Sequence, residues 1–444
     1  MNVLFFWLVL SMLVLASCAP RQEGMVRDLE VLPQSSAHYI PELTGELFSL
    51  EKQGELYRDF REAYFGPWTR SEPKFEAQEV FWGFDFIRNR EVYKENYLPA
   101  DPDWLGRMRQ QSDISGYPSR HKRAVTVDNA DMRAMPSRSP VFLDPQSPGE
   151  GFPFDYLQNT LVPAGTPVLI THVTRDGDWA LAETDYAAGW VRWSGLALVD
   201  DDFVQKFKSG SLAGFVQDQA PVYTAGGRHV FTGRVGMLLP QGESGALKDG
   251  QGIMVPVRDE HGQAALVEGK TRSGVLQKFP VPPTGDNFAG MMDSMLGQAY
   301  GWGGMYENRD CSAVLQDLFR MYGIFLPRNS AQQKSFKEPV SLEGLAREKK
   351  LEKIVEKGRP LLSILYMPGH VMLYLGKDPG SNKPVVYHSM WGLRTSRVWH
   401  SEPGRHIIGR TVITSLEPGR ELRNLARPEG LLINRVTHMT TVVD

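Results

Sequence analysis

The sequence has little cysteine: two residues in a chain of 444. Cys18 lies in the N-terminal segment, so the rest of the chain holds a single thiol, Cys311, and cannot form an internal disulfide. The N-terminus indicates export, and an exported protein that keeps one lone thiol uses it for reactivity more often than for structure. Cys311 is therefore the first candidate for a catalytic nucleophile.

The sequence also lacks a strong net charge and, beyond its N-terminus, any long apolar run. Lys and Arg number 49 against 52 Asp and Glu, which gives a net charge of -3. Without a basic excess, nothing favours nucleic acid as a partner. An apolar fraction of 41% is ample for packed cores. At about 150 residues per domain, the length predicts about three or four domains.

The N-terminus reads as an export signal. The apolar run from Val3 to Leu15 is too short for a transmembrane helix, which needs about 20 residues, but suits a secretory signal. It ends in Leu15-Ala16-Ser17-Cys18, the pattern that lipoprotein signal peptidase cuts, although no Lys or Arg precedes it. We expect residues 1–18 to be a lipoprotein signal peptide, in preference to an ordinary secretory signal or an uncleaved anchor. Cys18 would carry the lipid and hold the body in the cell envelope, outside the cytoplasm, or in the periplasm of an organism with two membranes.

Residues 19–122 predict a tether followed by a mostly helical domain. The stretch to about Ser36 is polar and contains prolines, as a spacer between lipid and folded body would. The aromatic clusters Tyr64–Trp68 and Phe81–Phe84 are expected to form the core of a small, irregular helical domain.

Two small β-barrels are predicted next. Residues 123–200 contain short alternating runs separated by turns. Trp179 and the segment Gly189-Trp190-Val191 resemble the bacterial SH3-like domain of cell-wall enzymes, in which a Trp-containing strand pairs with a Gly-Trp-Val strand. Residues 201–278 carry a weaker motif with similar strand spacing, which predicts a second SH3-like barrel.

The C-terminal region, residues 279–444, has the size and pattern of one α+β domain. Met291, Met295 and Ala299 recur at helical spacing and predict a helix from Phe288 to Tyr300, and a second apolar-faced helix begins at Cys311. Strands are expected at 361–366, 371–375, 385–388 and 407–414.

A helix N-terminus at Cys311 suits a nucleophile. A thiol is mostly protonated at neutral pH and needs a helix N-terminus, a neighbouring histidine or both to become a thiolate. The unpaired N–H groups of the first turn point at the sulfur, and they can also hold the oxyanion that forms when the thiolate attacks a carbonyl.

A hairpin nominates the histidines. His370 opens one expected strand and His388 closes the next, and the midpoint between them falls in the intervening turn. An antiparallel hairpin would place the two as near cross-strand neighbours, about 5 Å apart at Cβ, so that one serves as base and the other orients it. The remaining histidines stay unassigned. No second cysteine and no His-Glu-x-x-His spacing accompany Cys311, so we expect neither metal nor cofactor.

These motifs together resemble the NlpC-type cysteine peptidases, which cut peptidoglycan stem peptides. The residues that carry the resemblance, in chain order, are Tyr300-Gly301-Trp302-Gly303-Gly304, Arg309-Asp310-Cys311-Ser312, Leu326-Pro327-Arg328-Asn329-Ser330, Gly369-His370-Val371 and Tyr387-His388. Ala313 stands where the family usually has glycine.

The resemblance implies a papain-like fold that cleaves the bond between γ-D-glutamate and a diamino acid, diaminopimelate, with Cys311, His370 and His388 as catalytic residues. It places Tyr300 near the oxyanion, and Asp310 and Ser330 at the free amino end of the substrate. Ser312 and Trp302 complete the expected substrate-binding set. On the residues alone, Asp310 and Ser330 could equally be helix caps, and a carboxylate beside a thiolate calls for a cationic complement.

The barrels suggest a limit on substrate length. If the first barrel packs across the groove, with residues 149–156 as a wall, only stems with a free L-Ala amine would fit, which suits recycling of released peptides; ordinary loop packing is the alternative. The expected partners are stem peptides or muropeptides and, through the lipid, a membrane; we expect a monomer. An inactive cell-wall-binding lipoprotein and an acyl transferase or amidase on the same fold stay open as alternatives.

Overall fold

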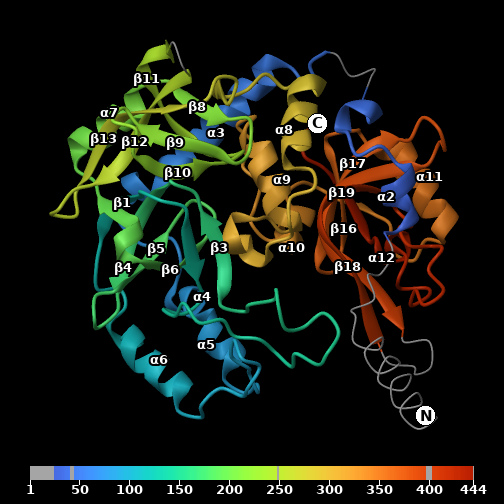
Figure 1. Cartoon of the computed structure of the whole chain (residues 1–444), viewed down its shortest axis with the longest axis horizontal. Helices are drawn as coiled ribbons and strands as arrows, with labels where there is room; N and C mark the ends of the chain where they lie inside the picture. The colour runs from blue at the N-terminus through green and yellow to red at the C-terminus, as the bar shows by residue number, and fades with distance from the viewer. Residues whose placement is uncertain (1–24, 41–44, 248–249, 397–402, 444) are drawn as a thin grey trace, which may run out of the picture.

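The computed structural model describes residues 25–40, 45–247, 250–396 and 403–443. The expected signal peptide and Cys18 lie outside these ranges. In Figure 1 the C-terminal sheet occupies one side of the molecule and the two barrels the other, with helices α8 and α9 between them. Among the described residues, no helix combines the length and apolarity that a membrane crossing needs.

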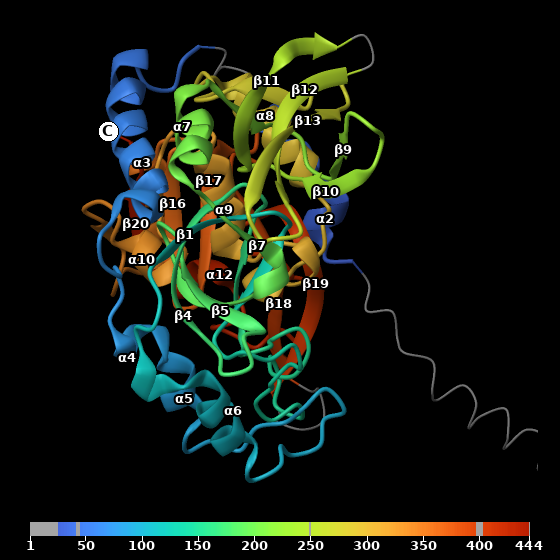
Figure 2. The same cartoon turned by 90° about the vertical axis from the view of Figure 1, so that its left-hand side faces the viewer.

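The N-terminal region is helical and spreads over the rest of the molecule instead of forming a core of its own. Figure 2 shows α4, α5 and α6 beneath the first barrel and α3 alongside it. The helices are α2 (Arg27–Val31), α3 (Leu50–Thr69), α4 (Ala77–Val80), α5 (Trp82–Ile87) and α6 (Trp104–Ser112), with 3-10 turns η1 (Ser36–Tyr39) and η2 (Ile114–Gly116).

The aromatic clusters of this region are buried, but in cores that they share with other domains. Trp68 packs edge-on against Phe207 of the second barrel, and its indole N–H donates to the carbonyl of Ala124 in the first, at 2.7 Å. Phe81 lies 6.3 Å from Trp190 of the first barrel, ring centre to ring centre. These aromatic residues are core residues, as expected, but their cores are shared with the two barrels.

The expected tether is also shorter than its composition suggests. Val26 is 1% exposed, and the backbone N–H of Ser415 donates to Asp28 at 2.7 Å. Gln34 exchanges two hydrogen bonds with the backbone of Ile413, at 2.9 and 3.0 Å. Residues 26–36 thus belong to the folded body, because their polar side chains pair with the edge of the C-terminal sheet.

The first barrel is a seven-stranded antiparallel sheet in the order β3-β2-β6-β5-β4-β1-β7. Leu181 pairs with Trp190 and Trp179 with Arg192, so the predicted pairing of the two tryptophan strands is correct. The strands are β1 (Lys122–Thr126), β2 (Ala130–Arg133), β3 (Gln158–Val162), β4 (Pro167–Val173), β5 (Trp179–Glu183), β6 (Ala188–Arg192) and β7 (Leu196–Leu198), with η3 (Trp193–Gly195) before the last.

The second barrel has the strand order β10-β9-β13-β12-β11-β8-β14. A helix that the β-rich reading missed, α7 (Asp201–Ser209), precedes it, capped by Asp200, whose side chain accepts from the N–H of Phe203. The strands are β8 (Leu212–Phe215), β9 (Ala220–Thr224), β10 (His229–Gly233), β11 (Leu238–Leu247), β12 (Gly250–Arg258), β13 (Ala264–Thr271) and β14 (Leu276–Lys278).

The C-terminal domain packs helices against a six-stranded antiparallel sheet in the order β15-β20-β16-β17-β18-β19. The helices are α8 (Gly285–Met295), α9 (Cys311–Arg320), α10 (Ser330–Lys334), α11 (Arg347–Lys357) and α12 (Leu432–Arg435), with η4 (Trp302–Glu307). The strands are β15 (Val340–Ser341), β16 (Ser363–Met367), β17 (His370–Lys377), β18 (Pro384–Ser396), β19 (Pro403–Ser415) and β20 (His438–Thr441). The predicted class, an α+β domain behind two small barrels and a helical N-terminal region, is confirmed.

One helix is shorter than its periodicity predicts. The pattern that includes Ala299 extends a helix to Tyr300, but α8 ends at Met295. Gly297 adopts a φ of +77°, a left-handed conformation that ends helices, and Ala299 instead makes a β-bridge to Arg410.

Candidate active site

Cys311 is the first residue of α9, as predicted. Asp310 is the N-cap, and its Oδ1 accepts from the backbone N–H of Ala313 at 2.8 Å. The helix is buried along its whole length and packs on β17 and β18, so the thiol is held in place by the core. Ala313, where the resemblance expects glycine, is the residue whose backbone N–H donates to the capping carboxylate.

The thiol is held in a buried environment that keeps it protonated. Burial, followed by the charge of Asp310, raises the pKa of Cys311 to about 12, while the backbone N–H groups of Val371 and Ser312 act in the opposite direction. The helix N-terminus alone predicts a lowered pKa, but burial outweighs it at this position. The N–H of Val371 places the sulfur beside the start of β17, whose first residue is His370.

His370 and His388 meet, though not as direct cross-strand partners. Leu373 pairs with Tyr387 and, nearer the turn, Lys377 pairs with Pro384, a register that sets His388 two residues from the position opposite His370. The two imidazoles lie on the diagonal, and Nε2 of His370 is 2.7 Å from Nδ1 of His388.

A chain of hydrogen bonds joins these rings to Thr414. The hydroxyl of Thr414 donates to the carbonyl of Ser415 at 2.8 Å, and Nε2 of His388 lies 3.0 Å from the same hydroxyl oxygen. When the Thr414 hydroxyl donates to this carbonyl, which can only accept, Nε2 of His388 carries a proton. Nδ1 of His388 then accepts from Nε2–H of His370, which leaves Nδ1 of His370 unprotonated and able to act as a base.

Both rings are neutral in this environment. Burial, with a contribution from Arg435, lowers the pKa of His370 to about 3. Burial and the neighbouring His370 lower the pKa of His388 well below its ordinary value. Burial thus favours the neutral forms of the thiol and of both imidazoles, so the proton must move as bonds to the substrate form.

Two adjoining cavities contain the chemistry. One, of about 500 Å³, is lined by Cys311, Asp310, Ser312, Ser330 and residues of the first barrel. The other, of about 240 Å³, contains His370. The two share a wall, formed by Tyr300, Trp302 and Gly369.

Asp310 already has a cationic complement within the chain. Nη2 of Arg328 donates to its Oδ2 at 2.7 Å and Nη1 to its Oδ1 at 3.1 Å. The hydroxyl of Ser312 and the N–H of Gly303 also donate to this carboxylate, so the charge argument for a cationic ligand at Asp310 no longer holds. Its role as helix cap, the alternative reading, is correct.

The remaining predicted residues also reach the site. Ser330 is the first residue of α10 and not its cap, which is Asn329, and its side chain lines the cavity of Cys311. Trp302 borders both cavities. Burial, followed by the nearby thiol, raises the pKa of Tyr300, which is consistent with a hydroxyl close to Cys311.

The glycines of the Tyr-Gly-Trp-Gly-Gly motif let the first barrel approach the site. Gly303 and Gly304 adopt φ values of +59° and +85°, and a Cβ on Gly304 would lie 2.5 Å from Cβ of Leu161 in β3. The carbonyl of Gly303 accepts from the amide of Gln158, also in β3, at 3.1 Å. The motif therefore joins the barrel to the loop that precedes Cys311.

The loop of residues 149–156 lies against the same wall. The ring of Phe154 packs edge-on against Trp302 at 5.2 Å and against Trp391 at 6.0 Å, measured between ring centres. Tyr156 lines the cavity of Cys311, and Phe154 that of His370. First-barrel residues thus border both cavities.

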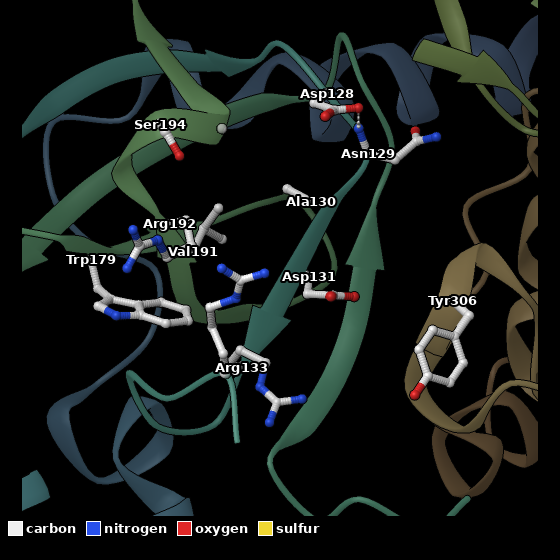
Figure 3. Close-up of a pocket in the computed structure, with 12 residues that line it drawn as sticks. Asp128, Asn129, Ala130, Asp131, Arg133, Trp179, Val191, Arg192, Ser194 and Tyr306 are labelled. Atoms are coloured by element: carbon white, nitrogen blue, oxygen red, sulfur yellow. Dashed lines mark hydrogen bonds between the residues drawn. The ribbon is translucent and has the colours of Figure 1, made fainter. Parts of the chain in front are cut away.

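A third cavity, of about 530 Å³, lies on the first barrel and carries no thiol or imidazole. Figure 3 shows Trp179, Arg192 and Asp131 around it, with Tyr306 opposite. Its lining residues include no cysteine and no histidine that could form a nucleophile with its base. Within the described ranges, no three His, Cys, Asp or Glu side chains lie where they could hold a metal ion together.

Comparison with protein-family models decides the classification. The NlpC/P60 family matches residues 297–399, which contain the thiol and both histidines, and an N-terminal "NLPC_P60 stabilising domain" matches residues 5–117. The chain contains an NlpC/P60 domain. An SH3 domain of SH3b1 type matches residues 140–192 and one of SH3b2 type residues 200–241, so the predicted family and its two SH3-like domains are confirmed. NlpC/P60 proteins are peptidoglycan hydrolases and endopeptidases, generally cysteine peptidases.

A solved structure shares the fold. An NlpC/P60 endopeptidase from Photobacterium damselae subsp. piscicida is 23% identical with a TM-score of 0.81, over 93% of this chain and 97% of that one. An NlpC/P60 family protein from Bacillus cereus is 15% identical over 72% of this chain and all of that one, but its TM-score of 0.44 is too low to add to the argument. No curated protein matches the chain.

Sequence reasoning missed three kinds of residue in this NlpC/P60 site. Arg328 lies inside a motif that the resemblance uses, but its ion pair with Asp310 joins two separate motifs. Thr414 carries no local signal, because only the strand register brings it to His388. The arginines around the cavity of His370 come from three separate elements and likewise have none.

Proposed function

We propose that this NlpC/P60 protein is a cysteine endopeptidase that hydrolyses the bond between γ-D-glutamate and diaminopimelate in peptidoglycan stem peptides. The observation that carries the proposal is the ordered chain from Ser415 through Thr414 and His388 to His370. This chain leaves Nδ1 of His370 free to accept a proton. His370 directly precedes Val371, whose backbone N–H lies beside the Cys311 sulfur.

The mechanism starts from the neutral pair. As the sulfur of Cys311 attacks the γ-carbonyl carbon, Nδ1 of His370 takes the thiol proton, and the new C–S bond converts the carbonyl oxygen to an oxyanion. The N–H groups at the start of α9 and the hydroxyl of Tyr300 stabilise this oxyanion. The imidazolium then protonates the diaminopimelate nitrogen, the C–N bond breaks, and water hydrolyses the thioester to free the γ-carboxylate.

His388 and Thr414 keep the base in its working form. Burial makes a free Cys311 thiolate costly in free energy, so His370 has to accept the thiol proton in the same step as the attack. Because Nε2 of His370 is held as a donor to His388, only Nδ1 remains to accept.

The preference for a free amino end is part of the proposal. Tyr156, Gln158 and Asn159 of the first barrel, with Trp82, line the cavity of Cys311 on the side away from His370. This closure supports substrates in which only L-Ala precedes the γ-D-glutamyl residue, as in stems that an amidase has released. Such a substrate fits a role in peptide recycling, and we further propose that Cys18 carries a lipid that holds the protein at a membrane.

The two cysteines provide a matched test of the nucleophile. Cys311→Ala should abolish cleavage of L-Ala-γ-D-Glu-diaminopimelate while the melting temperature stays within a few degrees, whereas Cys18→Ala should keep full activity on the soluble peptide. Mass spectrometry of the products separates hydrolysis from acyl transfer or amidase chemistry. Turnover by Cys311→Ala above a few per cent of wild type would refute the assignment, and a wild type that binds muropeptides without cleaving them would favour the scaffold alternative.

The second test addresses the amino end. N-acetylation of L-Ala should lower kcat/KM by about 100-fold or more, because the acyl group has no space beyond the wall of the first barrel. Equal rates on free and acetylated peptides would remove the preference while leaving the endopeptidase proposal in place.

A further inference from the structure

Three arginines converge on the cavity that contains His370. Arg394 lies on β18, Arg405 on β19 and Arg435 at the end of α12, and all three line this cavity. Arg394 and Arg405 are direct cross-strand partners. Like charges in that arrangement are destabilising, so the fold alone gives no reason for them.

Little in the described part of the chain offsets this charge. Among the described residues, none of the three arginines forms a salt bridge with a carboxylate; Arg405 donates to the carbonyl of Gly404 at 3.1 Å and Arg435 to that of Pro368 at 3.2 Å. Burial, and then the charges of Arg394 and Arg405, lower the pKa of Arg435 to about 10. Burial and the charge of Arg394 lower the pKa of Arg405, whereas the charge of Glu150 raises it.

The first barrel helps to hold one member of the cluster. Gly149 has a φ of +87°, and a Cβ built on it would lie 2.8 Å from Nη2 of Arg405. The nearby Glu150 accepts from the hydroxyl of Tyr156 at 3.0 Å. Arg405 is thus seated against the barrel loop, with its guanidinium at the cavity and not folded out into solvent.

The chemistry of the reaction assigns a side to each cavity. The histidine that protonates the leaving amine must lie on the leaving-group side of the scissile bond. The cavity with Cys311 and the barrel wall therefore holds the acyl portion, and the cavity with His370 and the arginines holds the peptide that leaves. Its other lining residues include Met390, Trp391 and Leu432, which suit the aliphatic chain of a diamino acid.

We propose that Arg394, Arg405 and Arg435 form a carboxylate-binding subsite for the leaving peptide. It would receive the carboxylate at the far end of diaminopimelate and the C-terminal carboxylate of a following D-Ala. This inference rests on the proposed function and deepens it, since it selects diaminopimelate over lysine, which has no second carboxylate. Guanidinium groups suit the task because each pairs with a carboxylate through two parallel hydrogen bonds.

The test measures binding of the leaving product, which needs no turnover. Calorimetric titration of the full chain with diaminopimelyl-D-alanine should give saturable binding. The two monoamides, one at the diaminopimelate carboxylate and one at the D-Ala carboxylate, should each bind about tenfold or more weakly, and lysyl-D-alanine should match the first of them. The two monoamides separate the two sources of carboxylate.

Variants locate the effect. Each of three single variants should weaken binding of the free dipeptide about tenfold: Arg394→Gln, Arg405→Gln and Arg435→Gln. Each should have little effect on binding of the monoamide in which the carboxylate bound by that arginine is already blocked. Arg107→Gln, on the exposed side of α6, is the matched control and should bind as wild type. Because removal of one arginine relieves repulsion, the melting temperatures should stay equal or rise, which distinguishes a lost ligand contact from a lost fold.

Each outcome decides one claim. Equal affinity for the dipeptide and both monoamides, absence of binding, or wild-type affinity in all three glutamine variants would overturn the subsite. Binding in the expected order by a protein that fails to cleave γ-D-glutamyl peptides would overturn the proposed function and leave the subsite standing. Cleavage of γ-D-glutamyl peptides by a protein that binds the dipeptide and its monoamides equally well would overturn the subsite and leave the proposed function standing.

Discussion

Arg328 and Asp310 form a buried ion pair directly beside the thiol, with Nη2 2.7 Å from Oδ2. The same guanidinium donates to Ser312 at 2.9 Å and, through Nε, to the hydroxyl of Thr160 in the first barrel at 2.7 Å. One side chain therefore connects the helix cap, the residue after the nucleophile and the neighbouring domain.

Loss of this arginine should be costly. Arg328→Met leaves the Asp310 carboxylate buried without its cation, so we expect the free energy of unfolding to fall by about 3–5 kcal/mol. Urea unfolding would measure it. The double variant Arg328→Met with Asp310→Asn should recover part of that loss, because no uncompensated charge remains; if the double variant is as unstable as the single one, the charge is not the cause.

Thr414 should act through the histidines. Thr414→Val removes the hydroxyl that accepts from His388, so the proton order of the two rings is no longer fixed, and we expect kcat to fall about tenfold or more with little change in KM. Thr414→Ser keeps the hydroxyl and is the matched control, with near wild-type kcat. Equal loss in both variants would point to packing and not to the hydrogen bond.

The pH dependence follows from the buried base. His370 accepts a proton only when neutral, and a pKa lowered to about 3 moves its protonation to more acid pH. The thiol, with a pKa raised to about 12, stays protonated throughout the neutral range. We therefore expect kcat/KM to be flat between about pH 5 and pH 8, whereas an ordinary imidazole loses its base form below about pH 6.5. An acid limb near pH 6.5 in the free enzyme would contradict the buried, neutral pair.

Gly304 tests the contact between the barrel and the active-site loop. Gly304→Ala introduces both a left-handed alanine and a clash with Leu161, so we expect a loss of about 2–4 kcal/mol in stability and a raised KM. Gly344→Ala is the matched control, because Gly344 has a similar φ of +70° with nothing within 4 Å of the added Cβ. It should cost only about 1 kcal/mol and leave KM unchanged. Similar effects of the two substitutions would show that the backbone strain, and not the barrel contact, is what matters.

Local patterns in the sequence were sufficient for the elements that depend on nearest neighbours. The helix that begins at Cys311 follows from an apolar face behind a capping aspartate, and the pairing of Trp179 and Trp190 strands follows from period-two alternation and turns. Where a local signal had a competitor, it failed: Gly297 ended a helix that its periodicity would have continued.

The sequence by itself determined the family, the two barrels, the lone thiol at a helix start and the two histidines of one hairpin, because each is written in residues close together in the chain. Only the tertiary structure decided that burial raises the thiol pKa, that Arg328 neutralises Asp310, that Thr414 sets the proton order of the histidines and that three arginines surround one cavity. These depend on desolvation and on contacts between residues far apart in sequence, and a pattern along the chain carries neither.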